Sequence, residues 1–113
     1  MLEHRQASRK PPNHTIPVTN AITGELIGCI GNLSISGMML VANQSIPSDA
    51  LFQFAFHLPD EHGQRCVLEL GVHEQWGEVA QTPGQYWAGF RIISIGPQDF
   101  NILYQWVNGA EKF

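Results

Sequence analysis

Alternation of apolar and polar positions is the clearest pattern in this sequence. Within residues 52–58, every second position carries a large apolar side chain, namely Phe52, Phe54, Phe56 and Leu58. Successive side chains of a strand point to opposite faces, so the pattern predicts a strand that lines the core with its phenyl rings. Residues 65–76 alternate in the same way and predict a long strand that is bent or lies at an edge.

Four further apolar segments complete a set of six predicted strands. They cover residues 15–19, 25–30, 38–42 and 86–95. Residue types that favour turns, such as Asn, Asp, Gly and Pro, separate the segments. Six consecutive strands with short connections predict a mainly β domain, either an antiparallel barrel or a sandwich.

The last segment of the chain changes to a helical period. Its apolar positions at helical spacing are Phe100, Leu103, Tyr104 and Val107. Pro97 suits the first turn of such a helix. We expect this stripe to pack across an open end of the barrel. Ile102 and Trp106 lie off the stripe, where they would touch the rim of the barrel or form a small exposed patch.

Length and composition fit one domain, because 113 residues with 43% hydrophobic content can bury a single modest core. There is no run of roughly 18 apolar residues and no apolar segment behind the basic N-terminus. We therefore expect a cytoplasmic protein without membrane insertion. Cys29 and Cys66 lie in apolar segments without metal-type spacing, which predicts buried free thiols and no disulfide or zinc site.

Charge is divided unevenly along the chain. Residues 1–10 hold three basic residues, Arg5, Arg9 and Lys10, and one acidic residue, Glu3, so their net charge is +2. Because the whole chain has a net charge of −4, residues 11–113 have a net charge of −6. An acidic body argues against general nucleic-acid binding, which needs a broad basic face. A short basic tail either clamps one small phosphate ligand or is merely solvated.

Two prolines divide the chain into an arm and a body. Pro11 and Pro12 disfavour a helix in the residues before them. We predict a flexible basic arm at residues 1–12 and a β-barrel domain with a C-terminal helix at residues 13–113.

Two arginines four positions apart, Arg5 and Arg9, give the arm a specific chemistry. In an extended segment they lie roughly 13 Å apart, enough to reach both sides of a dinucleotide. A guanidinium group can stack on guanine, donate to O6 and N7 of that base, or pair with phosphate oxygens. The sequence leaves open which of these contacts each arginine makes.

A polar pair follows the second predicted strand. Asn32 and Ser34 are two apart and would share one face of a strand, as ligand groups or as an ordinary solvated face. Gly37 either takes a positive φ at a turn or lets a ligand approach the backbone. Gly31 is expected to serve the same bend.

Taken together and in this order, these residues resemble two motifs of the PilZ domain, the bacterial receptor module for cyclic di-GMP. Arg5 and Arg9 match RxxxR, and Asn32-x-Ser34-x-x-Gly37 matches [D/N]xSxxG. Residues 89–90, Gly-Phe, are similar to the pattern of the family's final strand. The resemblance implies a six-stranded antiparallel β-barrel of the split, Greek-key type with a C-terminal α-helix. It also implies that the five motif residues bind the ligand.

Three further residues are candidates for the same site. Trp76 offers an indole that would stack on guanine or pack in the core or at its rim. His4 precedes the first arginine, at a position that influences in the family whether one or two ligand molecules stack. Lys10 adds a third cation to the arm.

The function that the resemblance implies is reception of a second messenger. The arm would order over the ligand and change the surface presented to an unidentified downstream protein. In the family, such partners control motility, pili, biofilm matrix or virulence. The alternatives are a PilZ-like adaptor that binds no nucleotide and uses the helix surface with Trp106, or an unrelated barrel for an apolar ligand.

Catalysis, metals and cofactors are not indicated. The five histidines are scattered without metal-type spacing, and no phosphate loop or nucleophile elbow is present. The nearest pair, His57 and His62, flanks Asp60 and Glu61 in a segment typical of a solvated hairpin.

Overall fold

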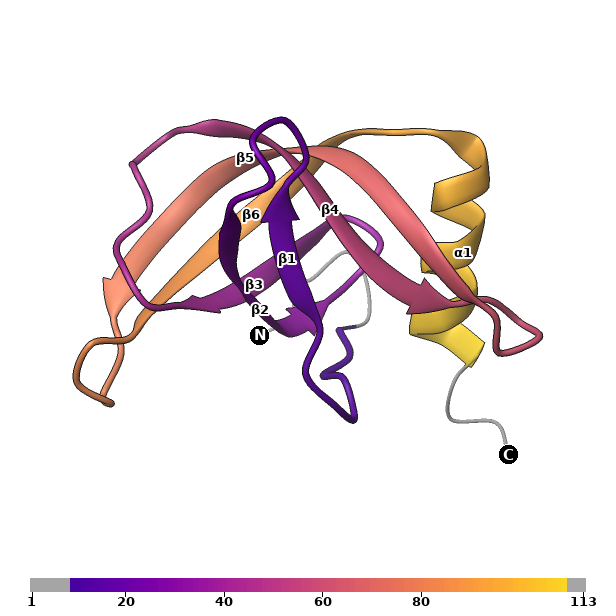
Figure 1. Ribbon diagram of the computed structural model, residues 1–113, viewed down its shortest axis with the longest axis horizontal. Helices are drawn as coiled ribbons and strands as arrows, with labels where there is room; N and C mark the ends of the chain where they lie inside the picture. Colours follow the sequence, from indigo (N-terminus) through magenta and orange to yellow (C-terminus); the bar gives the residue numbers. More distant parts are fainter. Residues whose placement is uncertain (1–8, 110–113) are drawn as a thin grey trace, which may run out of the picture.

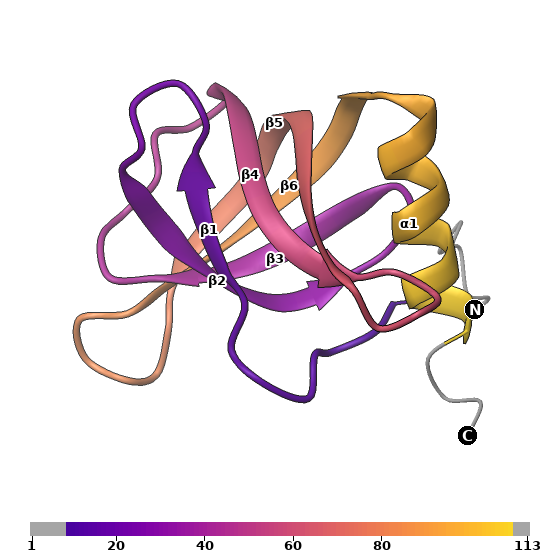
Figure 2. The ribbon, with the colours of Figure 1, turned by 45° about the vertical axis from the view of Figure 1, so that its right-hand side comes forward.

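Six antiparallel strands and one helix make up the protein (Figure 1), and this computed structural model describes residues 9–109. The strands are β1 (Pro17–Asn20), β2 (Leu26–Leu33), β3 (Gly37–Ala42), β4 (Leu51–Pro59), β5 (Arg65–Val79) and β6 (Tyr86–Ile95). The helix, α1 (Pro97–Gly109), follows β6 and covers one end of the barrel (Figure 2).

Strand pairing closes the sheet into a barrel in the order β1-β2-β3-β6-β5-β4. The strands β4, β5 and β6 are neighbours in sequence and in space, whereas β3 pairs with β6 across the long connection. That arrangement is a Greek key. The barrel closes weakly at one place, because β1 and β4 pair through only Thr19 with Ala55 and Asn20 with Phe54. The predicted mainly β barrel with a C-terminal helix is confirmed.

The core follows the predicted alternation. Phe54, Phe56 and Leu58 of β4 are buried, and complete burial of each such side chain contributes about 1.5–3 kcal/mol. The ring of Phe54 meets that of Phe90 from β6 edge to face, with centroids 5.0 Å apart. Phe52 is only partly buried and packs at the margin of the core.

Of the two alternatives predicted for β5, the bent strand is confirmed. The strand is long and bent but does not lie at an edge, since its first part pairs with β4 and its second part with β6. It bends where the register with β6 shifts, between Gly71 and Val72 and between Glu74 and Trp76. A bulge adds a residue to one strand and increases its local twist.

The buried side of α1 differs from the prediction. Leu103, Trp106 and Val107 are buried, whereas Phe100 is 37% exposed and Tyr104 is 49% exposed. Burial of the large Trp106 indole together with Leu103 and Val107 favours this side of the helix. In the first turn, Oδ2 of Asp99 accepts a hydrogen bond from the backbone N–H of Glu69, 3.1 Å away. Trp106 faces the barrel and Ile102 packs against the core, so of the two alternatives for these residues the structure shows contact with the barrel and not an exposed patch.

Two further expectations concern the cysteines and membrane insertion. Cys29 and Cys66 are free thiols, as predicted, but both are only half-buried. The helix of the described residues is too short and too polar to cross a membrane.

Candidate functional site

A β-bulge in β2 turns Asn32 outward. Ile30 pairs with Leu40 and Asn32 pairs with Met39, so Gly31 is the extra residue between them. Ile30 and Leu33 are both buried although they lie three apart. Without the bulge, strict alternation would place Asn32 on the same inward face as Ile30. Gly31 thus serves the bend that the sequence predicted.

A second bulge, in β5, does the same for Trp76. Glu74 pairs with Phe90 and Trp76 pairs with Gly89, which leaves Gln75 as the extra residue. Glu74 faces inward and is 4% exposed, whereas Trp76 is 45% exposed. Oε1 of Glu74 accepts the backbone N–H of Asp49 at 2.7 Å, which ties the β3–β4 connection to the bulge.

Between the two bulges lies a pocket of about 540 Å³ that spans four adjacent strands, β2, β3, β6 and β5. This volume falls within the range of small-molecule sites. Its lining residues are Arg9, Asn32, Ser36, Gly37, Met38, Met39, Gln75, Trp76, Gly89, Phe90 and Arg91. Of the predicted ligand residues, Arg9, Asn32, Gly37 and Trp76 therefore meet in one place.

Arg9 is held at the pocket by its own backbone neighbour. The backbone of Lys10 pairs with that of Leu33 through two hydrogen bonds of 2.9 and 3.0 Å. This brings Nη1 of Arg9 to donate to Oδ1 of Asn32 at 3.0 Å. A guanidinium group has five N–H donors, so most remain for a ligand.

Trp76 forms one wall of the pocket because residue 89 is glycine. A Cβ atom at Gly89 would overlap with the indole of Trp76 at Nε1 and Cε2. The indole therefore packs directly on the backbone of β6, while almost half of the residue stays exposed. An indole fixed on one side and open on the other suits base stacking.

Ser34 lies beneath the pocket and does not line it. The strand β2 ends at Leu33, so Ser34 begins a turn and does not share a strand face with Asn32, contrary to expectation. It is 1% exposed, and its hydroxyl accepts the backbone N–H groups of Ser36 and Gly37 at 3.2 and 3.1 Å. It shapes the turn into β3.

Gly37 is needed for close packing of strands. It is absent from the glycines with positive φ, which are Gly24, Gly63 and Gly84. A Cβ atom at Gly37 would overlap with the carbonyl oxygen of Phe90. Of the two alternatives for Gly37, the positive φ is therefore excluded, and it is the backbone of β6 that approaches this glycine.

The remaining predicted site residues lie elsewhere. The Lys10 ammonium lies 4.0 Å from the centre of the Trp106 ring, and Nζ donates to the Trp106 carbonyl oxygen at 3.0 Å. Lys10 thus holds the chain against α1. Arg5 and His4 lie outside the described residues.

Arg91 is the charged pocket residue that sequence reasoning missed. It lies opposite Gly37 in the β3–β6 pairing and is exposed. Within residues 9–109, no hydrogen bond or ion pair involves its side chain. The alternation of Ala88 and Phe90 as inward positions would have marked Arg91 as outward, but its place beside Gly37 depends on the pairing of β3 with β6.

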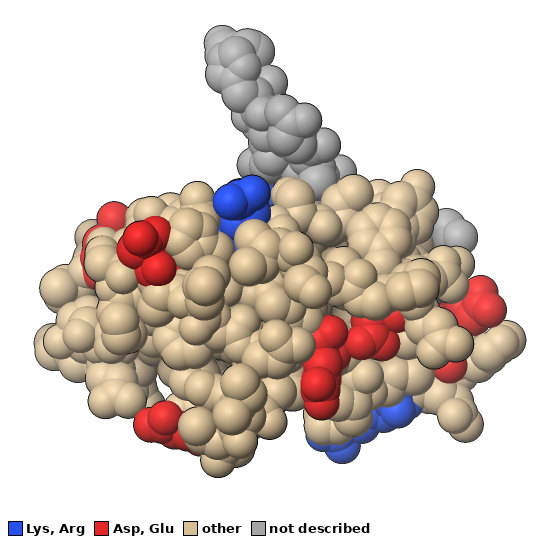
Figure 3. Space-filling model, turned by 90° about the horizontal axis from the view of Figure 1, so that it is seen from above, with Lys and Arg blue, Asp and Glu red and all other residues tan. Residues whose placement is uncertain are grey.

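The lining of the pocket is positive, with Arg9 and Arg91 and no carboxylate among its residues. The wider surface is not basic. In Figure 3, Lys and Arg side chains on the visible face form small separate groups among Asp, Glu and uncharged side chains. Positive charge is local, which suits a small anion better than a nucleic acid. In residues 9–109, no group of three or more His, Cys, Asp or Glu side chains is placed to hold a metal.

Comparison with solved structures finds this fold in proteins of low sequence identity. The inhibitor of motility MotI/DgrA from Bacillus subtilis matches with a TM-score of 0.75 and 17% identity, over 94% of this chain and 50% of that one. The PilZ domain of YcgR from Escherichia coli, in a structure with c-di-GMP, matches with a TM-score of 0.61 and 16% identity, over 93% and 89% of the two chains.

A third match is the PilZ domain of CeSA from a cellulose-synthesizing bacterium, with a TM-score of 0.56 and 18% identity over 91% and 97% of the two chains. The present chain spans about half the length of the MotI/DgrA chain. No family model and no curated protein sequence matches it. The chain therefore has the fold of a PilZ domain.

Proposed function

We propose that this protein is a cytoplasmic, non-enzymatic receptor for cyclic di-GMP and belongs to the PilZ family. The observation that carries the proposal is the pocket between the two bulges. It gathers Arg9, Asn32, Trp76 and Arg91 from separate segments, with no carboxylate in its lining. Cyclic di-GMP matches this lining, because it carries two anionic phosphates and two flat guanine bases that can stack on an indole. The shared fold with the YcgR domain, solved with that ligand, supports the same assignment.

Each side chain has a role that suits this ligand. The guanidinium groups of Arg9 and Arg91 donate to phosphate oxygens or to O6 and N7 of guanine. Asn32 orients Arg9 through the 3.0 Å hydrogen bond and offers its amide N–H₂ group to the ligand. Trp76 stacks on a guanine ring. Ser34 and Gly37 act indirectly, by shaping the turn and the strand contact beneath the pocket.

Binding would act on the arm. The RxxxR motif supplies Arg5 as a second arm cation, with His4 beside it, and both would close over a ligand that Arg9 already borders. The surface of the arm would then change for a downstream protein that reads it. The protein itself needs no cofactor or metal in this scheme.

Isothermal titration of the protein with cyclic di-GMP tests the proposal, with GTP and cyclic di-AMP as competitor nucleotides. We expect selective binding at micromolar or lower ligand concentration. The double variant Arg5→Ala/Arg9→Ala should lose it, since each hydrogen bond to a charged group contributes about 1.5–3 kcal/mol.

Arg65→Ala is the matched control, because it removes one positive charge at a residue that does not line this pocket. It should bind like the wild type. Absence of heat and of a thermal shift at saturating ligand would reject the receptor function and favour an adaptor that works without nucleotide.

A further inference from the structure

A second cleft opens where β1 and β4 diverge. The two strands pair only around Ala55 and Phe54, although β4 continues to Pro59 and pairs with β5 along its whole length. Ala21 donates its backbone N–H to the carbonyl oxygen of Gln53 at 2.7 Å, so the backbone groups of Gln53 face β1. Alternate residues of a strand direct these groups to the same side. The N–H and C=O of His57 therefore face the cleft, where β1 no longer pairs with β4.

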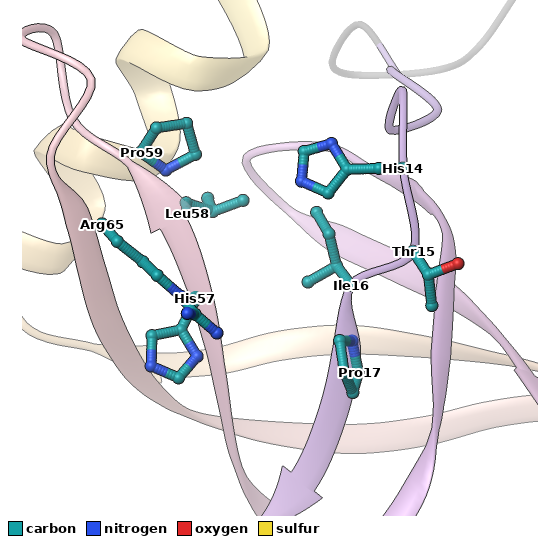
Figure 4. A pocket seen from close by; sticks show the side chains of 8 residues that line it. All are labelled: His14, Thr15, Ile16, Pro17, His57, Leu58, Pro59 and Arg65. Carbon is teal, nitrogen blue, oxygen red and sulfur yellow. The ribbon is translucent and has the colours of Figure 1, made fainter.

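The cleft is largely apolar and has a volume of about 450 Å³. Its lining residues are His14, Thr15, Ile16, Pro17, His57, Leu58, Pro59 and Arg65. In Figure 4, the side chains of His14 and Leu58 approach from opposite walls, and those of His57 and Arg65 lie side by side. Ile16 and Leu58 are 3% and 1% exposed and form its apolar floor.

The cleft is positively charged, whereas the whole chain has a net negative charge. The lining contains one formally charged residue, the cation Arg65, together with two histidines. The net charge of the whole chain, in contrast, is −4. The nearest carboxylates in sequence, Asp60 and Glu61, belong to the β4–β5 turn and do not line the cleft. An occupant with a carboxylate and apolar groups would complement this lining.

We propose that the cleft binds an extended, acidic segment of a partner protein, which adds as a strand to the free edge of β4. The backbone of the segment would pair with the N–H and C=O of His57. An apolar side chain would rest on Ile16 and Leu58, and an adjacent Asp or Glu would pair with Arg65. Strand addition draws affinity from main-chain hydrogen bonds and specificity from pockets for alternate side chains.

This site shares no lining residue with the nucleotide pocket. The proposal therefore does not rest on the proposed function, and its test contains no nucleotide. The cleft lies on β1, β4 and the start of β5, whereas the pocket lies on β2, β3, β6 and the later part of β5.

The test begins with a displayed library of random short peptides selected on the full chain. We expect enriched peptides that alternate apolar residues with at least one Asp or Glu. A synthetic copy of an enriched peptide should slow hydrogen exchange of the His57 amide and shift the NMR signals of cleft residues.

Two matched pairs of variants complete the test. His57→Pro removes the edge N–H without touching the β4–β5 hydrogen bonds, and should abolish peptide binding, whereas His57→Ala should retain it. Arg65→Glu should weaken binding by about tenfold or more, whereas Arg91→Glu, the same charge reversal in the other pocket, should not. Thermal unfolding shows which variants fold. If the His57→Pro variant does not fold, the comparison of Arg65→Glu with Arg91→Glu and the hydrogen exchange of the His57 amide still test whether the peptide binds in the cleft.

Four results would overturn the proposal. They are failure of the library to enrich any peptide, enrichment of peptides without acidic residues, equal peptide binding by the Arg65→Glu variant, and peptide contacts that map outside the cleft. Saturable shifts of the same amides by decanoate, without peptide binding, would assign the cleft to a small carboxylic acid. Concentration-dependent dimerisation through β4 would assign it to a second copy of the chain.

Discussion

At the scale of single residues, Arg9 and Arg91 give the pocket between the two bulges its positive charge although they lie far apart in the sequence. Arg9 is already paired with Asn32, while the side chain of Arg91 has no hydrogen bond or ion pair within the described residues. An arginine that faces a pocket without a protein partner has all its donors available to an anion. Arg91 is therefore the more informative of the two for ligand binding.

Arg91→Ala should weaken cyclic di-GMP binding by about 1.5–3 kcal/mol, the range for a hydrogen bond to a charged group. The unfolding free energy of this variant should change little, since the Arg91 side chain has no hydrogen bond or ion pair with any of residues 9–109. Titration calorimetry and urea unfolding measure the two quantities. Arg91→Lys should recover only part of the affinity, because an ammonium group cannot bind in a bidentate way.

Ser34→Ala should reduce the stability of the protein more than its affinity for the ligand. The substitution leaves the backbone N–H groups of Ser36 and Gly37 without their acceptor. The N–H of Gly37 is buried, so its loss of a partner costs about 1–3 kcal/mol of unfolding free energy in a urea titration. Any loss of affinity should be smaller than that of the Arg9→Ala variant. Unchanged stability together with a large loss of affinity would show that Ser34 touches the ligand.

Sequence alone predicted part of this site. The motif residues Arg9, Asn32 and Gly37 border the pocket, as does Trp76. Ser34 was predicted to sit beside Asn32, but its hydroxyl is used by the backbone of the turn. Arg91 has no motif, because its position depends on a strand pairing that local patterns do not encode.

At the scale of elements, the bulges in β2 and β5 decide what the pocket contains. Each adds one residue and reverses the facing of the side chains after it, which brings Asn32 and Trp76 outward. Uninterrupted alternation located the strands but could not show these reversals. Helical spacing likewise could not show that Trp106 lies on the buried side of α1, because packing against the barrel decides which side is buried.

Gly37→Ala should destabilise the protein by about 1–3 kcal/mol, because a Cβ there overlaps with the backbone carbonyl of Phe90 in the adjacent strand. Gly31→Ala is the matched comparison. Its Cβ would lie 2.7 Å from Cε of Met39, the far end of a flexible side chain that can move. Urea unfolding of both variants should rank Gly37 as the more sensitive position, and the reverse ranking would contradict the strand contact described for Gly37.

The β4–β5 hairpin should lose stability in acid. The carboxylate of Asp60 accepts the backbone N–H groups of Gln64 and His62 at 2.9 and 2.8 Å, and these hydrogen bonds hold its pKa below the usual value. A lowered folded pKa gives stability above the unfolded pKa of about 3.9, which is lost as the pH falls through the folded pKa. Thermal midpoints measured from neutral pH to pH about 2 should therefore fall more for the wild type than for Asp60→Asn, and parallel profiles would argue against this role.

At the scale of the whole molecule, Lys10 connects three distant parts of the chain. Its backbone pairs with Leu33 of β2, and its ammonium group contacts Trp106 of α1. The segment that carries Arg9 and the helix that covers the barrel are therefore joined through one residue. The barrel and its helix were predictable from periodicity, but this connection was not, because a basic arm was expected to stand apart from the body.

Lys10→Ala should lower the unfolding free energy by about 1–2 kcal/mol, through loss of the cation–π contact and the hydrogen bond to the Trp106 carbonyl. Lys10→Arg should lose less, since it keeps a cation over the indole. Urea unfolding and nucleotide titration together separate two roles for this residue. Reduced affinity with unchanged stability would mean that Lys10 contacts the ligand and not the helix.

The pairing of β3 with β6 also has a consequence for synthesis of the chain. Gly37 and Arg91 border the same pocket, yet β3 must wait for β4, β5 and β6 before Gly37 meets its partner. Such long-range pairings form late in folding, because loop closure precedes the contacts that stabilise it. An emerging or partly unfolded chain, with β1 to β3 alone, therefore has no complete pocket. A ligand of this pocket would therefore bind only the fully folded chain and would stabilise it.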